Sequence, residues 1–499
     1  MLTPFKFIIL HDFTQMKKKI ILLLLVLIVL VVKIQAQFQT GIYSSNFSGV
    51  MGPMINPSST NWLSNSTEIM PIGLSFNVMN NGFYMPAQPL PTLLGGSFSQ
   101  LMSDTGKNVS EVFDRVFKIN RDLKKSNYAY IDFTMMGPSF LTSFGKSSVG
   151  LYTGLRTISA SYGLSPELAT FLLKGNRTND LFGKTMSMDG SRSGNLAFYD
   201  IAGNYSTIIN ESQRYAHRLG FNAHLLLGIN SVYWADNGTN WTFGTDSVIY
   251  FEQGSFNFGY AATNSKYVSE LMKLRGTGFA GDIGYTIIRK RKGIRSTNAQ
   301  CPNIAGGGRV RQFQTYRWKL GVSVMDIGFI NFKTQTVNTD YKNVFGGIDS
   351  LIDEAYKGVF ALDRALRFGF TGNPNVGFTQ TDNYIHYLPT RVNVQFDFNW
   401  REMWFLSFTA SQRVVFNSNL SNRAPNITSV AIRHETSKQE WSVPISLIEY
   451  QYPIVGFHYR YGPFFIGTNH ALEMIGLRKI RGVDMYLGLK FNISHIKGY

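Results

Sequence analysis

The stretch Asp484-Met485-Tyr486-Leu487-Gly488-Leu489-Lys490-Phe491-Asn492-Ile493 decides the fold, because polar or small residues alternate in it with apolar ones without a break. Side chains of a strand point to opposite faces with a period of two, so this stretch forms a strand with one apolar and one polar face. A transmembrane barrel shows this pattern, since its apolar residues face lipid and its polar residues face the lumen. The pattern also fits a soluble sandwich, so the decision needs the rest of the chain.

The same alternation recurs over most of the chain. Apolar side chains share one face at Met70, Ile72, Leu74, Phe76 and Val78, and residues 128–135, 279–287, 391–400 and 404–411 alternate in the same way. Roughly fourteen such segments can be counted, each near the ~9–11 residues that a tilted membrane strand needs. Trp400 and Trp404 flank a tight turn, as expected of an aromatic girdle. We predict an all-β protein, a closed antiparallel transmembrane β-barrel of about 14 strands with an N-terminal plug and a few short helices.

An export signal precedes the strand pattern. Lys17, Lys18 and Lys19 are followed by an apolar run over residues 20–32 and by the small-residue end Ile34-Gln35-Ala36. These three parts make a secretory signal peptide, so we predict cleavage near Ala36 and residence in the outer membrane of a Gram-negative cell. Met16 is the predicted start, with residues 1–15 an upstream extension. An uncleaved anchor helix is the alternative, but the run is short for a membrane span.

Composition supports a barrel and indicates its partners. The 499 residues include 14% aromatic residues, only 16% charged residues and 47 glycines, which fits aromatic girdles and strands that bend. A net charge of +17 would indicate nucleic-acid binding in a cytosolic protein. In an exported barrel it predicts contact with outer-membrane lipid and lipopolysaccharide head groups, and no nucleic acid. The single cysteine, Cys301, forms no internal disulfide and is interpreted as a loop residue.

Three parts follow from these patterns: residues 1–36 as extension plus signal peptide, residues 37–66 as an N-terminal hatch, and residues 67–499 as the barrel. The segment 37–66 has no strand periodicity, yet its composition is not that of a disordered tail. We predict that it plugs the lumen, with Asn56 and Pro57 as a rigid turn and candidate gate. A mobile periplasmic tail is the alternative. Helices are predicted at residues 104–125, 165–174, 267–274 and 348–362.

Two groups of charged residues are candidate functional sites. The first group falls on the polar faces of predicted strands and either pairs across the lumen or lines a pore; it comprises Asp132, Asp282, Arg391, Asp397, Asp484 and Lys490. The second group lies in a loop over residues 289–312 that has no acidic residue. It either grips phosphate groups of lipid or forms a solvated loop, and comprises Arg289, Lys290, Arg291, Lys292, Arg295, Arg309 and Arg311.

Catalytic motifs are absent from the sequence. There is no nucleophile elbow, no His-Glu-x-x-His motif, no phosphate-binding loop and no dinucleotide motif. The histidines have no metal-ligand spacing, and a meeting of His458 with Ser446 has no support beyond their presence. We predict that the protein is not an enzyme and uses no metal or cofactor.

Short motifs resemble a known family. Ser45-Asn46-Phe47-Ser48-Gly49-Val50 and Ile55-Asn56-Pro57-Ser58 resemble the N-terminal signature of an uncharacterised Bacteroidota outer-membrane barrel family, and residues 319–328, 460–467 and 482–490 are similar to it as well. Asn56-Pro57 also resembles the start of FadL-type fatty-acid transporters, with Ser58 in place of their alanine. That resemblance implies a barrel plugged by an N-terminal hatch and handling hydrophobic molecules.

Three functional hypotheses remain open. The first is a plugged channel or transporter for a small hydrophobic ligand, and the second is a non-transporting scaffold for secretion or surface-assembly proteins. The third is an outer-membrane enzyme. An apolar lumen with a lateral opening would favour transport, whereas a lumen closed by paired charges and a broad outer loop surface would favour a scaffold.

Overall fold

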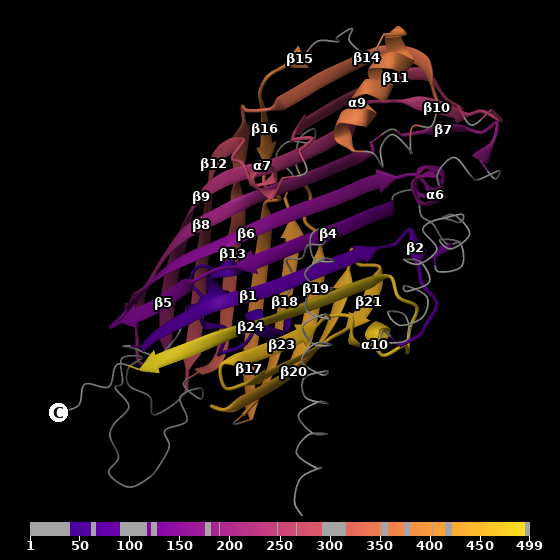
Figure 1. Ribbon diagram of the computed structural model, residues 1–499. Coiled ribbons are helices and arrows are strands. Elements are labelled where there is room, and N and C mark those ends of the chain that lie inside the picture. Colours follow the sequence, from indigo (N-terminus) through magenta and orange to yellow (C-terminus); the bar gives the residue numbers. More distant parts are fainter. Residues whose placement is uncertain are drawn as a thin grey trace, which may run out of the picture.

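The computed structural model describes residues 40–60, 66–89, 117–120, 127–174, 181–188, 190–246, 248–265, 267–291, 316–349, 351, 358–373, 380–401, 403–414 and 422–494. Its main element is a closed antiparallel barrel of 14 strands (Figure 1), which confirms the predicted fold class. In order around the wall the strands are β1 (Ser66–Asn80), β4 (Asn127–Met136) continued by β5 (Ser139–Phe144), β6 (Ser147–Leu164), β8 (Arg192–Glu211), β9 (Tyr215–Asp236), β12 (Gly276–Lys290), β13 (Tyr316–Phe332), β16 (Tyr384–Tyr387) continued by β17 (Arg391–Arg401), β18 (Trp404–Arg413), β19 (Ile427–Glu435), β20 (Gln439–Ile448), β21 (Tyr452–Val455) continued by β22 (Phe457–Tyr461), β23 (Phe464–Thr468) and β24 (Gly482–Ser494).

The first and last strands close the ring. β1 pairs with β24 along one edge, from Ser66 opposite Ser494 to Met79 opposite Gly482, and with β4 and β5 along the other edge. The end of the barrel that holds Ser66 and Ser494 is called the terminal end below, and the opposite end is called the loop end.

The predicted faces of the strands are confirmed in the wall. In β24 the side chains of Met485, Leu487 and Leu489 are at least partly exposed on the outside, while Asp484 and Lys490 are buried on the inside. The segments predicted at residues 279–287, 391–400 and 404–411 show the same outward apolar and inward polar alternation. A wall that is apolar outside and polar inside is the arrangement of a barrel surrounded by lipid.

Met70 is the exception, and its predicted outward position is wrong. The register of β1 against β24 jumps from Ile69 opposite Phe491 to Ile72 opposite Leu489, so β1 carries one extra residue there. This β-bulge coincides with Pro71, which has no N–H to give to the sheet. The extra residue reverses the parity, and Met70 is fully buried inside the barrel.

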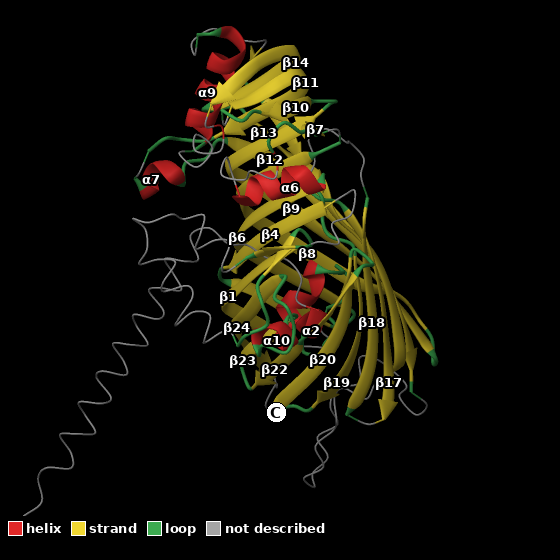
Figure 2. Cartoon of the chain, turned by 90° about the vertical axis from the view of Figure 1, so that its right-hand side faces the viewer, coloured by secondary structure: helices red, strands yellow, loops and turns green. Residues whose placement is uncertain are grey.

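The sheet of the barrel wall continues at the loop end into an extension beyond the ring of strands. The last residues of β9 leave β12 and pair with β11 (Val248–Ala261), which pairs with β14 (Thr336–Asp349). The short strands β10 (Asn240–Phe243), β7 (Thr185–Ser187) and β15 (Gln380–Thr381) complete this extension. The helix α9 (Val359–Thr371) packs on it (Figures 1 and 2), and its core is aromatic, with Trp241, Phe256 and Tyr341 buried.

Some of the predicted helices are present in the structure and others are not. α6 (Pro166–Lys174) and α7 (Val268–Leu271) lie within predicted segments. The helix predicted at 348–362 is wrong at its start, because residues 348–349 end β14. Leu351 is helical, residues 352–357 lie outside the described residues, and α9 begins at Val359. Of the helix predicted at 104–125, only 117–120 are described, and Lys118–Ile119 form the strand β3 against β2 (Phe83–Tyr84). A further short helix, α10 (Ala471–Met474), joins β23 to β24. Among the described residues, no helix combines the length and hydropathy needed to cross a membrane.

Candidate functional site

Residues 40–60 lie inside the ring of strands and are called the hatch below. They form the short helices α2 (Thr40–Tyr43; Figure 2) and η1 (Gly49–Met54). Most of their side chains are buried. Their apolar side chains pack on inward-facing residues of the wall; this cluster includes Ile42, Val50, Met51 and Ile55 of the hatch and Met70, Met136, Leu141 and Phe465 of the wall. The first described residue is Thr40, so residues 37–39 and 61–65 of the predicted hatch segment, like the signal peptide, lie outside the described residues.

Asn56 is the most enclosed polar residue of the hatch and bonds both to the wall and to its own turn. Its side-chain amide donates to Oε1 of Gln395 at 3.2 Å and to Oγ1 of Thr286 at 3.4 Å. Its Oδ1 accepts from the backbone N–H of Ser58 at 3.0 Å and from the Ser58 hydroxyl at 2.7 Å. An Asn side chain that bonds two residues ahead forms an Asx-turn, and here this turn fixes the backbone conformation from Asn56 through Pro57 to Ser58.

Three glycines of adjacent strands form a seat for this turn. A Cβ at Gly284 of β12 would lie 2.1 Å from Oδ1 of Asn56, and a Cβ at Gly321 of β13 would lie 2.6 Å from its Nδ2. A Cβ at Gly220 of β9 would lie 2.4 Å from the carbonyl carbon of Pro57. Gly220 and Gly284 stand opposite each other in the sheet, and Gly321 stands opposite Thr286. The three residues are called the glycine seat below. Their contact with the hatch was not predicted; the available signal was that each is a glycine on the inward face of its strand.

Wall side chains also hold the backbone of the hatch around Asn56. The amide groups of three wall asparagines donate to hatch carbonyls: Asn222 to Pro53 at 3.0 Å, Asn393 to Ile55 at 2.9 Å and Asn204 to Pro57 at 3.1 Å. The hydroxyl of Ser323 donates to Ile55 as well, at 2.6 Å. Buried backbone carbonyls need such partners, because a lone buried polar group costs about as much as a lost hydrogen bond. The wall therefore supplies the hydrogen bonds that water would otherwise give.

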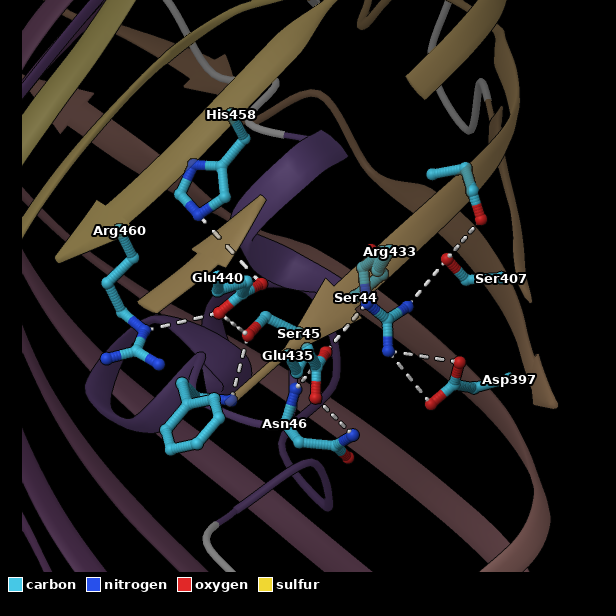
Figure 3. Close-up of polar contacts among 12 residues, drawn as sticks. Ser44, Ser45, Asn46, Asp397, Ser407, Arg433, Glu435, Glu440, His458 and Arg460 are labelled. Atoms are coloured by element: carbon cyan, nitrogen blue, oxygen red, sulfur yellow. Dashed lines mark hydrogen bonds and ion pairs between the residues drawn. The ribbon is translucent and has the colours of Figure 1, made fainter. Parts of the chain in front are cut away.

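Two glutamates grip the other half of the hatch near the terminal end (Figure 3). The Ser45 hydroxyl donates to Glu440 at 2.7 Å, and the Asn46 amide donates to Glu435 at 2.7 Å. Both carboxylates are fully buried, and each has an arginine of the wall beside it. Arg433 lies 2.8 Å from Glu435 and 3.1 Å from Asp397, and Arg460 lies 3.3 Å from Glu440. Arginine and hydrogen-bond partners of this kind offset part of the cost of taking the carboxylates out of water.

A second charged layer crosses the middle of the lumen. Arg156 bridges Asp200 at 2.9 Å and Asp326 at 3.0 Å. His224 lies between Asp200 at 2.8 Å and Asp282 at 2.9 Å, joining strands β8, β9 and β12. These side chains are largely buried and paired with one another, which is the first of the two arrangements expected for charges on the lumen face.

The predicted lumen-facing charges have different surroundings in the structure. Asp282 belongs to the middle layer, and Arg391 lies 3.4 Å from Asp326 in the same layer. Asp397 pairs with Arg433 near the terminal end, and Lys490 donates to the carbonyls of Phe47 and Ser48 in the hatch. Asp484 accepts from His470 at 2.8 Å and from the backbone of Asn469, which holds the connection after β23. Oδ1 of Asp132 has no hydrogen-bond partner among the described residues.

The candidate head-group loop is described only at its first residues. Arg289, Lys290 and Arg291 lie at the terminal end of β12. Lys290 points inward, and its ammonium group forms an ion pair with Glu211 of β8 at 2.6 Å. This group is therefore not available to bind lipid phosphate. Arg291 donates to the side chain of Asn399. Lys292, Arg295, Arg309 and Arg311 lie outside the described residues, as does Cys301.

The loop half of the lumen has a different lining. Inward-facing Tyr128, Tyr130 and Tyr162 pack there with Ile448 and Ile454. A small cavity of about 20 Å³ lies next to them, lined by Met79, Asp132 and Arg391 among others, and it has room for about one water molecule. The lumen toward the loop end thus carries an aromatic cluster, with the ion pair of Arg413 and Glu449 beside Tyr130 and with Arg423 over the ring of Tyr162.

The described residues contain no metal-like cluster of His, Cys, Asp and Glu. His458 and Ser446 are not brought together. His458 stands opposite Ser442 and stacks on Tyr486, while the Ser446 hydroxyl donates to Ser429.

Comparison with known proteins gives a family and a set of structural neighbours. The profile of a family described as "Family of unknown function (DUF5723)" matches residues 73–469. A deletion mutant of the TodX monoaromatic hydrocarbon channel is 7% identical and covers 93% of this chain and 98% of its own, with a TM-score of 0.41. The Pseudomonas putida toluene transporter TodX is 8% identical, covering 91% and 95%, with a TM-score of 0.37. A Pseudomonas aeruginosa FadL homologue is 8% identical, covering 90% and 94%, with a TM-score of 0.19. No curated protein matches the chain.

Proposed function

The chain belongs to the DUF5723 family of unknown function, and we propose from the geometry of its lumen that it is a gated outer-membrane channel whose hatch opens for small, largely hydrophobic molecules. One observation carries the proposal: the hatch has no charged side chain of its own, and most of the charged wall residues that bond to it also have an ion-pair partner in the wall. Glu435 and Glu440 keep Arg433 and Arg460 as partners when Ser45 and Asn46 are removed.

Opening the hatch therefore leaves few unpaired buried charges behind. Lys490 loses two hatch carbonyls, but Glu68 lies 3.9 Å from it. The remaining contacts are hydrogen bonds, which contribute about 0.5–1.5 kcal/mol net each between neutral groups and about 1.5–3 kcal/mol where Glu68, Arg218 or Lys319 takes part. A hatch held in this way can be displaced without unfolding the wall, whereas breaking one partner of a buried ion pair costs roughly 3–5 kcal/mol.

The lining of the loop half supports the choice of cargo. Three tyrosine side chains and two isoleucines face inward there, and together they offer an aromatic and aliphatic surface. Sites for small molecules are mostly apolar with a few polar groups that orient the ligand. A compact molecule with an apolar body fits this surface better than a charged solute does. The proposal includes no catalytic step.

Deletion of residues 37–59 tests the gate. The truncated and full-length chains are reconstituted in planar bilayers, and single-channel conductance is recorded. We expect larger and steadier currents after the deletion, because the wall strands close the ring without the hatch. Equal currents from both proteins would refute the gate. Heat-modifiable migration and recovery in the outer-membrane fraction show that the truncated barrel is folded and inserted, and recovery of the full-length chain as a soluble periplasmic protein would refute the location.

A scaffold for secretion or surface-assembly proteins is a second candidate, and both the paired charges of the lumen and the extension at the loop end favour it. This extension stands beyond the barrel and exposes large apolar side chains, Phe345 of β14 and Phe368 of α9 among them. Exposed apolar side chains outside the lipid belt can mark a protein interface. Replacing Phe345 and Phe368 with Ser, followed by crosslinking in cells, tests this role. Loss of a crosslinked partner with unchanged conductance favours the scaffold.

A further inference from the structure

We propose that residues 267–274, called the anchor segment below, bind the lipid surface at the rim of the barrel and set the depth of the protein in the membrane. The segment joins the extension strand β11 to the wall strand β12 and contains α7. The proposal concerns the outer surface of the protein and is independent of whether the hatch opens.

The anchor segment exposes its apolar side chains. Tyr267 is 76% exposed and Val268 is 71% exposed, and Leu271 and Leu274 are exposed as well. No residue of α7 is buried, and the helix stands away from the barrel wall (Figure 2). A helix of four residues has no stability of its own in water, since isolated helices shorter than about 12–15 residues are marginal. Something other than helix propensity must hold it in place.

Arg275 holds the segment from the barrel side. Its side chain is buried, and its guanidinium group donates to the carbonyls of Glu270 at 2.7 Å and Lys273 at 3.0 Å. The same group donates to Ile229 of β9 at 2.7 Å and to the side chain of Gln335 at 2.8 Å. One buried cation thus satisfies the free carbonyls at the end of α7 and ties them to the wall. The apolar side chains are therefore presented outward by a fixed support.

The lipid-facing surface of the wall continues directly into the anchor segment. Phe279, four residues into β12, is 65% exposed on the outside of the barrel. It stands between Leu225 of β9 and Phe329 of β13, which are both exposed on the same face. The anchor segment precedes this row at the loop end of β12, so it lies at the edge of the apolar belt.

The chemistry of the segment fits the interface between lipid tails and head groups. Its two charged side chains, Glu270 and Lys273, pair with each other at 2.6 Å and leave no net charge. Tyr267 adds an aromatic ring with a polar hydroxyl, the residue type that is enriched at membrane interfaces. An apolar face with a small polar side lies in the plane of the interface. Lipid, and not a protein partner, is therefore the assigned occupant.

Fluorescence quenching by brominated lipid tests the assignment. In a Cys301→Ser background, Val268→Cys carries a bimane label in liposomes whose lipid chains are brominated near the head group. We expect a blue-shifted emission and a loss of intensity relative to liposomes without bromine. Lys342→Cys is the matched control, because the Lys342 side chain is 76% exposed but lies on the extension strand β14; its label should show neither change. Leu271→Cys provides a second reporter on the same helix.

Labels at 268 and 271 that behave like the label at 342 would overturn the proposal, and would place the segment in water or against a protein. Heat-modifiable migration of each labelled variant shows that the barrel is folded, so a negative result cannot come from misfolding. Conductance recorded on the same liposomes separates this result from any failure of the gate.

Discussion

Gly284→Ala tests whether the glycine seat holds the hatch. The added methyl group would lie 2.1 Å from Oδ1 of Asn56, 2.8 Å from Cδ of Pro57 and 3.0 Å from its nitrogen. Real Cβ contacts are not that short, so either the hatch turn or the strand must move. β12 is paired on both sides with β9 and β13, whereas the turn is held by a few side-chain hydrogen bonds. We expect the turn to leave its seat.

The size of the effect follows from overpacking. Added methyl groups in a well-packed interior cost about 1–3 kcal/mol. This penalty falls on the closed state and is relieved when the hatch leaves, so it shifts the ratio of open to closed channels by about 5- to 150-fold. The wall itself is not weakened to the same extent, because the strain disappears in the open state.

Single-channel recording checks this shift. Gly284→Ala should open more often and for longer than the wild type in planar bilayers. Gly281→Ala on the same strand is the matched control, since the nearest atom to its added Cβ is a carbonyl oxygen at 3.9 Å, which is an ordinary contact. Equal open probability in the two variants would refute the idea that the seat holds the hatch closed.

Three further predictions concern the wall, the glutamate grip and the anchor segment. Phe396→Arg should impair insertion, because a charge on the lipid face costs about 2–4 kcal/mol; Asn492→Arg on the lumen face should be milder, as measured by the heat-modifiable fraction. Glu435→Gln should lower stability by about 1.5–3 kcal/mol, because Arg433 loses the charged hydrogen bond to its closest carboxylate and keeps only Asp397; thermal unfolding in detergent measures this, and an unchanged midpoint would contradict it. Arg275→Met should speed hydrogen exchange of amides 267–274, since each charged hydrogen bond contributes about 1.5–3 kcal/mol, and unchanged exchange would argue against the support role.

The wall could be predicted from the sequence because its signal is local. A residue of a strand faces lipid or lumen according to its parity, so the alternation from Asp484 to Lys490 determines which side chains of β24 are buried. A prediction from parity is wrong where one strand has an extra residue relative to its partner. This happens at Met70, where the bulge at Pro71 adds one residue to β1. The predicted helix start at residue 348 is wrong for a related reason. β14 continues through Asp349 because its partner β11 supplies hydrogen bonds there, and the local sequence pattern does not reveal that partner.

The contacts of the candidate site could be predicted only in part. Asn56 and Pro57 were found by their turn chemistry, and the structure places them against the wall. The partners of the lumen charges could not be found, because a pair such as Arg156 and Asp326 joins strands far apart in the sequence. Lys290 shows the same limit: its neighbours in sequence are basic, but its side chain turns inward to Glu211. The basic composition of residues 289–312 indicates a loop, but the burial of Lys290 depends on the register of β12, the strand in which it lies.

The short polar residues of the hatch follow from the wall around them. At Asn56 the wall offers three positions without side chains, so the hatch can bring its backbone and a small amide against the sheet. At Ser45 and Asn46 the wall offers carboxylates that already have arginine partners, so the hatch needs only neutral donors to complete them. A charged hatch would have to bury its own ions, and a large apolar one would leave these wall groups without hydrogen bonds. Small neutral donors satisfy the hydrogen-bond acceptors of the wall in the closed state. When the hatch leaves, water can replace these donors, and a gate requires such an exchange of its plug.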